Sequence, residues 1–305
     1  MSDAPIPRYD VIGIGNAIVD VIASADDGFL ASEALDKGSM VLIDAERATQ
    51  LYARMGPGRE VSGGSAANTL ACLASLGRTC AFVGQVADDQ LGEVFTHDIR
   101  AGGIHFDVAP YTGEAPTARC LILVTPDGQR TMNTYLGATQ YLPESAIDES
   151  LIADAAILYL EGYLWTADEP REAMRRAMHA ARAAGRKIAF TLSDVFVIDL
   201  HRAEIDAMIA DGMIDILFGN ENEVCAMAQT QDFEKAVATL SEKLPMLVAT
   251  RSEKGAICIE NGTRSETYAA DVKEVIDTTG AGDAFAAGFL AGHGTGMDNG
   301  EALRM

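Results

Sequence analysis

The sequence predicts an α/β fold in which a mostly parallel central sheet is covered by helices on both faces, with a small β-sheet lid attached. Two observations carry this prediction. In the second half of the chain, short apolar runs typical of buried strands alternate with segments typical of helices. In the first half, shorter β segments and turn signals interrupt that alternation.

The N-terminal half begins with a buried strand and then departs from the alternation. The apolar run 9–14 predicts this strand, and residues 18–43 predict shorter segments with turns at Asp26-Asp27-Gly28 and Lys37-Gly38. Further on, two β segments flank Pro126-Asp127-Gly128, which favours a hairpin. The other expected elements are helices over 66–76 and 91–101 and strands over 80–86, 118–125 and 130–135.

The C-terminal half alternates regularly between strands and helices. We expect strands over 156–160, 187–191, 214–219 and 247–250, and helices over 169–184, 203–210, 221–228 and 233–244. The chain shows no internal repeat and no low-complexity linker. We therefore expect residues 1–305 to form a single α/β domain, with a lid built from segments near 16–44 and 105–137.

Composition excludes several classes of partner. The 305 residues include 45 Asp and Glu against 23 Lys and Arg, which gives a net charge of −22, and 48% are hydrophobic. This acidity speaks against nucleic acid and against an anionic membrane surface. The longest uncharged stretch, residues 62–77, is too polar and too short to span a bilayer. A small anionic ligand is not excluded, because one local site can oppose the overall field.

The termini and the cysteines indicate the compartment. Residues 1–8 contain no apolar run typical of a signal peptide. The five cysteines are scattered without a CxxC pair, which is typical of free thiols in a reducing cytosol, and the five histidines show no metal-ligand spacing. We therefore expect a cytoplasmic protein without structural zinc.

The strongest chemical signal is Asp277-Thr278-Thr279-Gly280-Ala281-Gly282-Asp283, which precedes a helix expected over residues 284–291. A glycine-rich turn that leads into a helix points several backbone N–H groups at one spot, and the helix dipole adds positive potential there. Such a site binds phosphate without a basic side chain. Asp283 is then explained as a general base beside the phosphate, or alternatively as a helix cap.

Together with its neighbours, this motif resembles the signature of the ribokinase (PfkB-type) family of sugar and nucleoside kinases. Three further runs match family elements in the family's order: Gly15-Asn16-Ala17-Ile18-Val19-Asp20, Ser62-Gly63-Gly64-Ser65-Ala66-Ala67-Asn68-Thr69 and Asn220-Glu221-Asn222-Glu223. The first two are most similar to the adenosine-kinase-like branch. The resemblance implies a three-layer ribokinase-like fold with a β lid.

The resemblance assigns the catalytic and acceptor-binding roles position by position. Asp283 is expected to be the catalytic base, and the amides of Gly280, Ala281 and Gly282 are expected to stabilise charge on the transferring phosphoryl group. Asp20 is expected to accept hydrogen bonds from two sugar hydroxyls, with the turn at Gly63 and Gly64 approaching the ring. Asn68 and Asn16 are expected to complete the acceptor pocket. Taken alone, an aspartate in the position of Asp20 is more often a turn residue.

The nucleotide side is expected to involve ATP and Mg²⁺. Asn220 and Glu223 would organise the metal and the ATP phosphates through water, since Mg²⁺ retains much of its hydration shell. Without the other motifs, the same pair is explained as a capped helix start. Thr250, Arg251 and Gly255 are expected to contact the nucleotide, although Ser252 stands where the family commonly has glycine. Tyr163 and Trp165 follow a predicted strand and either line the pocket or pack in the core.

The resemblance implies transfer of the γ-phosphoryl group of ATP to a primary hydroxyl of a small-molecule acceptor, with the adenosine 5′-hydroxyl first. A free-sugar kinase acting on ribose, fructose or 2-keto-3-deoxygluconate is the alternative, and a non-catalytic sugar-binding protein on the same fold is a remote one. A dinucleotide-dependent oxidoreductase is disfavoured because Ile18 replaces the third small residue of its fingerprint. No P-loop motif occurs.

Two expectations concern the whole chain. Residues 300–305 read as the start of an amphipathic helix without a stop signal, so C-terminal helices that help to wall the nucleotide base are expected to be missing. By the same resemblance, we expect a monomer or a homodimer formed through the lid.

Overall fold

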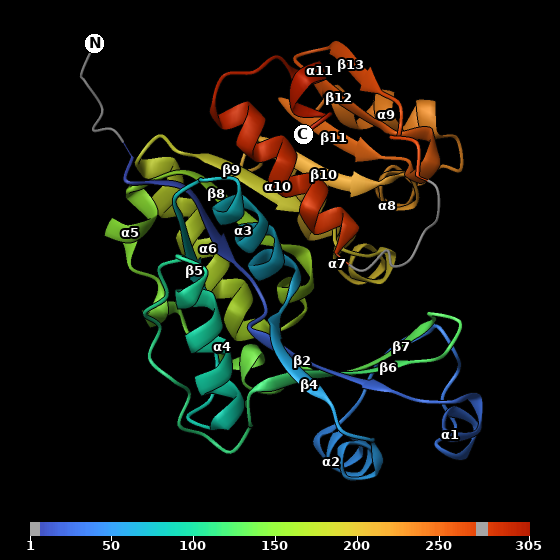
Figure 1. Ribbon diagram of the computed structural model, residues 1–305. Coiled ribbons are helices and arrows are strands. Elements are labelled where there is room, and N and C mark those ends of the chain that lie inside the picture. Colours follow the sequence, from blue (N-terminus) through green and yellow to red (C-terminus); the bar gives the residue numbers. More distant parts are fainter. Residues whose placement is uncertain (1–6, 273–279) are drawn as a thin grey trace.

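The computed structural model describes residues 7–272 and 280–305 and contains two sheets (Figure 1). The larger sheet has the strand order β13-β12-β11-β10-β9-β8-β1-β5. It is parallel from β5 to β11, while β12 and β13 are antiparallel additions at one edge. Its strands are β1 (Tyr9–Ile14), β5 (Cys80–Val83), β8 (Ala155–Glu161), β9 (Lys187–Thr191), β10 (Ile216–Asn220), β11 (Met246–Thr250), β12 (Ala256–Glu260) and β13 (Thr263–Thr267).

Helices cover the large sheet on both faces, so the predicted three-layer fold is confirmed. One face packs against α6 (Asp168–Ala183), α7 (Val195–Ala210), α8 (Glu221–Met227) and α9 (Phe233–Ser241), and α5 (Glu149–Ala153) lies beside α6. The other face packs against α3 (Ser65–Ser75), α4 (Gln90–Ala101), α10 (Ala281–Gly294) and α11 (Asn299–Ala302). Helices α3 and α10 lie side by side on this second face (Figure 1).

The small sheet projects from the body of the molecule with the order β3-β7-β6-β2-β4 (Figure 1). A third, smaller core lies between one of its faces and two short helices, and it includes Leu30, Leu51 and Leu121. The other face of the sheet is turned toward the large sheet. The elements are β2 (Ile18–Ser24), β3 (Met40–Leu42), β4 (Arg59–Gly63), β6 (Ala118–Val124), β7 (Arg130–Tyr135), α1 (Asp27–Ser32) and α2 (Ala45–Arg54).

The small sheet differs from the predicted segments 16–44 and 105–137. Strand β4 belongs to it although it lies between those segments. Residues 105–111 instead run beside the large sheet, where His105 bridges Ala81 and Tyr111 bridges Ala87. The turn predicted at 26–28 begins helix α1, because the carboxylate of Asp26 accepts a hydrogen bond from the Phe29 amide as a helix cap.

Several boundaries differ from the sequence prediction. Helix α7 begins at Val195, eight residues before the predicted 203–210 helix, and is kinked at His201. The β12–β13 hairpin was not predicted, because the polar outer strand carries little apolar signal. Helix α10 begins at Ala281 rather than at residue 284. Among the described residues, no helix combines the length and apolar character needed to cross a membrane.

Candidate active site

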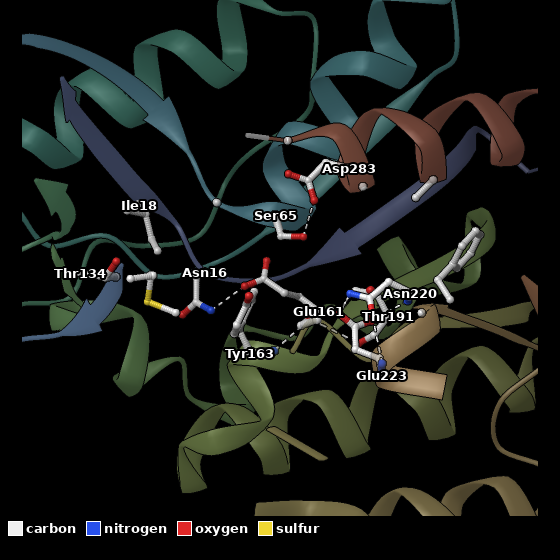
Figure 2. Close-up of a pocket in the computed structure, with 18 of the residues that line it drawn as sticks. Asn16, Ile18, Ser65, Thr134, Glu161, Tyr163, Thr191, Asn220, Glu223 and Asp283 are labelled. Atoms are coloured by element: carbon white, nitrogen blue, oxygen red, sulfur yellow. Dashed lines mark hydrogen bonds between the residues drawn. The ribbon is translucent and has the colours of Figure 1, made fainter. Parts of the chain in front are cut away.

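A cavity of about 390 Å³ lies between the two sheets, where the parallel strands of the large sheet reach their carboxyl ends. Ligands of open α/β sheets bind at this edge, and the volume is within the usual range for small-molecule sites. Residues at or just after five strand ends line it. Four of them are labelled in Figure 2, namely Asn16, Glu161, Thr191 and Asn220, and the fifth is Thr250.

The N-terminus of α10 opens into this cavity. Gly280 precedes the helix in the left-handed region with φ of 72°, which favours glycine, and it makes no side-chain cap. The first amides of an α-helix have no partner within the helix, so those of Ala281, Gly282 and Asp283 remain available for an anion. Gly280 and Gly282 line the cavity, whereas Ala281 does not. Asp277, Thr278 and Thr279 of the predicted motif lie outside the described residues.

Asp283 is held by two residues of α3. Its Oδ1 accepts a hydrogen bond from Ser65 Oγ at 2.6 Å (Figure 2). Its Oδ2 accepts a hydrogen bond from Asn68 Nδ2 at 3.4 Å. Burial raises the pKa of the Asp283 carboxyl, and these two hydrogen bonds oppose the rise. Its carboxyl therefore combines a fixed orientation with raised basicity, which are the two properties a general base needs. Asn68 reaches the cavity only through this contact.

The small sheet supplies the opposite wall with a row of side chains from four neighbouring strands. Strand register places Asp20, Cys120, Thr134 and Leu42 side by side, and all four line the cavity. Thr134 Oγ1 donates to Cys120 Sγ at 3.3 Å, and burial raises the pKa of the Cys120 thiol to about 12, so the thiol is neutral. Met40 and Met132 form a parallel apolar pair beside this row.

Asp20 is the carboxyl of this wall. Burial raises its pKa to about 6, against the opposing attraction of Arg130. Gly63 does not line the cavity, but a Cβ there would lie 2.6 Å from Asp20 Oδ2, so glycine leaves room for this carboxyl. A half-buried carboxyl at a cavity whose described lining residues include no cationic side chain is suited to accept hydrogen bonds from the hydroxyls of a ligand.

Gly64 brings two chain segments into close contact. It has φ of 102°, and a Cβ there would lie 2.1 Å from the Asn16 carbonyl oxygen. Both Asn16 and Gly64 line the cavity, as expected. Asn16 Nδ2 donates to Glu161 Oε1 at 2.6 Å (Figure 2). Sequence reasoning missed Glu161, although a carboxylate at the end of an apolar strand, directly before Gly162, was a usable signal.

Asn220 and Glu223 form a capping box at the start of α8. The Asn220 side chain accepts a hydrogen bond from the Glu223 amide, and the Glu223 carboxylate accepts from both the amide and the side chain of Asn220. Glu223 is only 6% exposed, and burial raises its pKa to about 7. The cap interpretation is therefore correct for the local structure, and both residues also line the cavity.

The three residues predicted to contact the nucleotide do not all lie at the cavity. Thr250 lines the cavity, but Arg251 and Gly255 do not. The Arg251 guanidinium lies 4.0 Å from the centre of the Phe233 ring and bonds to Glu221 at 3.3 Å, so it supports the surface around α8. At Gly255, φ is 92° and a Cβ would lie 1.9 Å from the Thr267 carbonyl oxygen, so this glycine is required by the β12–β13 hairpin.

The ionisable lining residues that the structure describes are predominantly acidic. Four carboxyls line the cavity, from Asp20, Glu161, Glu223 and Asp283, and none of the described lining residues is Lys, Arg or His. The only positive potential that the described part of the wall supplies is from backbone amides. No described group of three or more His, Cys, Asp or Glu is arranged to hold a metal ion.

The two aromatic residues singled out from the sequence, Tyr163 and Trp165, lie in different environments. Tyr163 lines the cavity, together with Phe196 and Phe285, which were not predicted. Trp165 is fully buried in the core and packs edge-on against Phe190. Ser65 and Thr134 also line the cavity without having been assigned a role from sequence.

An uncapped helix start, a carboxyl within its first turn and a small sheet on the opposite side of the cavity are the features to compare with known proteins. The model of the pfkB family carbohydrate kinases matches residues 38–305. The chain belongs to this family. It is a sugar or nucleoside kinase, and kinases of this family are phosphotransferases that use ATP and an alcohol acceptor.

The similar proteins include both adenosine kinases and sugar kinases. This pfkB-family chain is 47% identical to the adenosine kinase from Sinorhizobium meliloti, covering 97% of this chain and 90% of that one with a TM-score of 0.90. It is 45% identical to a probable sugar kinase from Rhizobium etli, covering 98% and 91% with a TM-score of 0.91. The adenosine kinase of Dictyostelium discoideum is 24% identical over 94% of this chain and 89% of its own length.

Proposed function

We propose that this kinase transfers the γ-phosphoryl group of ATP to a primary hydroxyl of a neutral ribonucleoside, with the 5′-hydroxyl of adenosine as the preferred acceptor. The observation that carries the proposal is the composition of the small-sheet wall. One carboxyl, Asp20, is suited to a sugar diol, and beside it lie the thiol of Cys120 and the apolar side chains of Leu42, Met40 and Met132. An apolar surface next to a diol-binding carboxyl suits a nucleoside, whose flat base needs such a surface.

In the proposed mechanism, Asp283 accepts the proton of the attacking hydroxyl while Ser65 and Asn68 hold its carboxylate in place. The amides at the start of α10 stabilise the negative charge on the transferring group. Asp20 fixes the acceptor by hydrogen bonds to its sugar. Closing of the small sheet over the acceptor would exclude water and suppress hydrolysis of ATP.

Asn220 and Glu223 suit Mg²⁺ bound through water. Each Glu223 oxygen accepts one hydrogen bond within the capping box and retains a further lone pair. This carboxyl is buried at the cavity without a cationic side chain among the described lining residues, a situation that a divalent ion relieves. When bound, Mg²⁺ supplies charge neutralisation for the phosphates.

The charge of the cavity distinguishes among acceptors. 2-Keto-3-deoxygluconate carries a carboxylate, and four carboxyls face the cavity, so this acceptor is disfavoured by like-charge repulsion. Ribose and fructose are neutral, but they leave the apolar side chains of the small sheet uncovered. The similarity to the S. meliloti adenosine kinase supports the same order of preference.

The test is magnesium-dependent ADP formation with adenosine, inosine, ribose, fructose and 2-keto-3-deoxygluconate at equal concentrations. We expect the highest kcat/KM with adenosine and the lowest with the keto-deoxy acid. A free sugar with a higher kcat/KM than every nucleoside would favour the free-sugar kinase. A Leu42→Ala variant, which removes apolar surface only, is expected to lower kcat/KM for adenosine more than for ribose.

A further inference from the structure

The buried carboxylate of Glu161 joins the acceptor end of the cavity to the catalytic end. It lies at the last position of β8, is 1% exposed and is centred among the labelled side chains of Figure 2. The proposed mechanism gives it no role. A buried carboxylate without a function is costly to a fold, so its partners indicate what it does.

One partner is the start of helix α3. Gly64 stands at the N-cap position of α3 and has no side chain, so the helix makes no cap of its own. Glu161 Oε2 accepts the amide hydrogen of Ala66 at 2.8 Å across 95 positions of sequence. A carboxylate at a helix N-terminus satisfies an unpaired amide and interacts favourably with the helix dipole. Glu161, at the end of strand β8, therefore caps helix α3.

The other partner is Asn16, whose Nδ2 donates to Glu161 Oε1 at 2.6 Å. Asn16 follows β1 and lines the acceptor cavity. Close packing fixes the carboxylate between these partners, since a Cβ at Gly15 would lie 2.3 Å from Glu161 Oε2 and 2.6 Å from the Ala66 Cβ. Both carboxylate oxygens are therefore used, one for each segment.

The first residue of α3 continues this connection to Asp283. Ser65 directly precedes the capped Ala66 and donates from Oγ to Asp283 Oδ1 at 2.6 Å. The hydrogen bonds thus run from Asn16 through Glu161 to the first turn of α3, and from Ser65 to the carboxyl of Asp283. A displacement of the helix start would change the acceptor contacts at Gly64 and the orientation of Asp283 together.

We propose that Glu161 is a positioning residue that couples acceptor binding to the orientation of Asp283, by capping α3 with one carboxylate oxygen and holding Asn16 with the other. This inference rests on the proposed function of the cavity. It concerns the acceptor side and the base but not the nucleotide, because the three hydrogen bonds made by Asn16, Glu161 and Ser65 involve neither α8 nor β11.

The first test is Glu161→Gln, which keeps the shape but replaces one acceptor oxygen with a donor, so it cannot accept from both partners. Loss of one hydrogen bond to a charged group changes a binding or rate constant by about tenfold. We therefore expect adenosine KM to rise by roughly tenfold and kcat to fall by roughly tenfold. ATP KM should change by less than about twofold. The matched control is Asp10→Asn, which alters a carboxylate that accepts the Thr79 amide hydrogen at the opposite end of β1. It is expected to leave all three constants unchanged.

A merely structural role would lower the melting temperature of Glu161→Gln without altering the constants of the folded enzyme, and that result would overturn the proposal. A change confined to ATP KM would overturn it as well. If the wild-type protein phosphorylates no nucleoside or sugar, the proposed function itself has failed. Normal wild-type turnover with unchanged Glu161→Gln constants refutes only the coupling.

The second test does not require the Glu161 variant to fold. Asn16→Ala and Ser65→Ala alter the two ends of the connection, and their side chains share no hydrogen bond with each other. We expect the double variant to lose less kcat than the product of the single losses, because loosening either end already misplaces the helix start. Independent, multiplicative losses would contradict the coupling.

Discussion

Two helices begin at the same cavity, and their first turns are built in opposite ways. Helix α8 is closed by its own side chains, because Asn220 and Glu223 form a reciprocal capping box. Helix α10 begins with Gly280 in a left-handed conformation and makes no side-chain cap. Asp283 occupies its first turn but is bound to Ser65 and Asn68 of another helix.

Because of this difference, the starts of α8 and α10 are suited to ligands of opposite charge. An uncapped helix start leaves amide donors that stabilise an anion, so α10 is suited to the transferring phosphoryl group. At α8, by contrast, the capping box occupies the Glu223 amide and leaves a buried carboxylate facing the cavity, which is suited to a hydrated cation. One helix start at this cavity is thus suited to the phosphate part of a metal–nucleotide complex, and the other is suited to its cation. The following predictions test this contrast, in order of decreasing effect.

The largest effect is expected from Asp283→Asn at the open helix start. It removes the proton acceptor but preserves side-chain size, so kcat should fall by roughly 10²–10⁴-fold while the dissociation constant for adenosine changes little. Steady-state kinetics and calorimetric binding measure the two quantities. The control is Asp298→Asn, which alters the cap of α11 and should leave kcat unchanged. Near-normal turnover by Asp283→Asn would contradict the assignment of the base.

Gly282→Ala tests whether a ligand approaches the open start closely. A Cβ at Gly282 meets no atom of the described residues within 4 Å, and the same holds for Gly294 at the other end of α10. Because alanine favours helix, neither substitution should destabilise the protein. We expect kcat/KM for ATP to fall by about tenfold in Gly282→Ala and not in Gly294→Ala. Equal kinetics for the two variants would show that no phosphate approaches the amides of this turn.

The closed helix start is tested by Asn220→Ala, which removes the cap. We expect a loss of about 1 kcal/mol in the free energy of unfolding and a severalfold rise in the Mg²⁺ concentration for half-maximal activity. Asp232→Ala removes the cap of α9, where the carboxylate accepts the Lys235 amide hydrogen, and provides the control. It should lose similar stability and keep the wild-type Mg²⁺ dependence. The same Mg²⁺ dependence in both variants would show that the start of α8 has a structural role and does not help to bind Mg²⁺.

The last effect concerns stability rather than activity, through its dependence on pH. Burial raises the pKa of Glu223 and of Glu161 to about 7, well above the ordinary range of unfolded chains. Between about pH 4.5 and pH 7 the folded state therefore binds protons that the unfolded state has released, so these groups make the free energy of unfolding fall as pH rises, by at most about 1.4 kcal/mol per pH unit for each carboxyl.

Urea unfolding at pH 5, 6, 7 and 8 measures this slope. Glu223→Gln removes one titrating group, so its stability should depend less steeply on pH than that of the wild type. A variant slope as steep as that of the wild type would show that Glu223 ionises normally in the folded protein.

The order of strands and helices was largely predictable because it depends on local periodicity. Buried parallel strands give continuous apolar runs, and the runs at β1, β8, β9 and β11 were located within one or two residues. The strands β4 and β13 were missed because partly exposed strands owe their pairing to neighbours that the local sequence does not reveal. Strand β12 is buried and apolar, so its local signal was usable and was overlooked.

The residues of the candidate site divide in the same way. The glycine-rich start of α10 and the position of Asp283 within it were determined by the sequence itself, since adjacent residues form one turn and its free amides. Only the tertiary structure decided that Ser65 holds Asp283 across 218 positions and that Glu161 caps α3 across 95. It also decided that Asp20, Cys120 and Thr134 form one row. A helix cap or a cross-strand neighbour supplied from far along the chain leaves no local pattern, because its only requirement is that the fold bring the two atoms together.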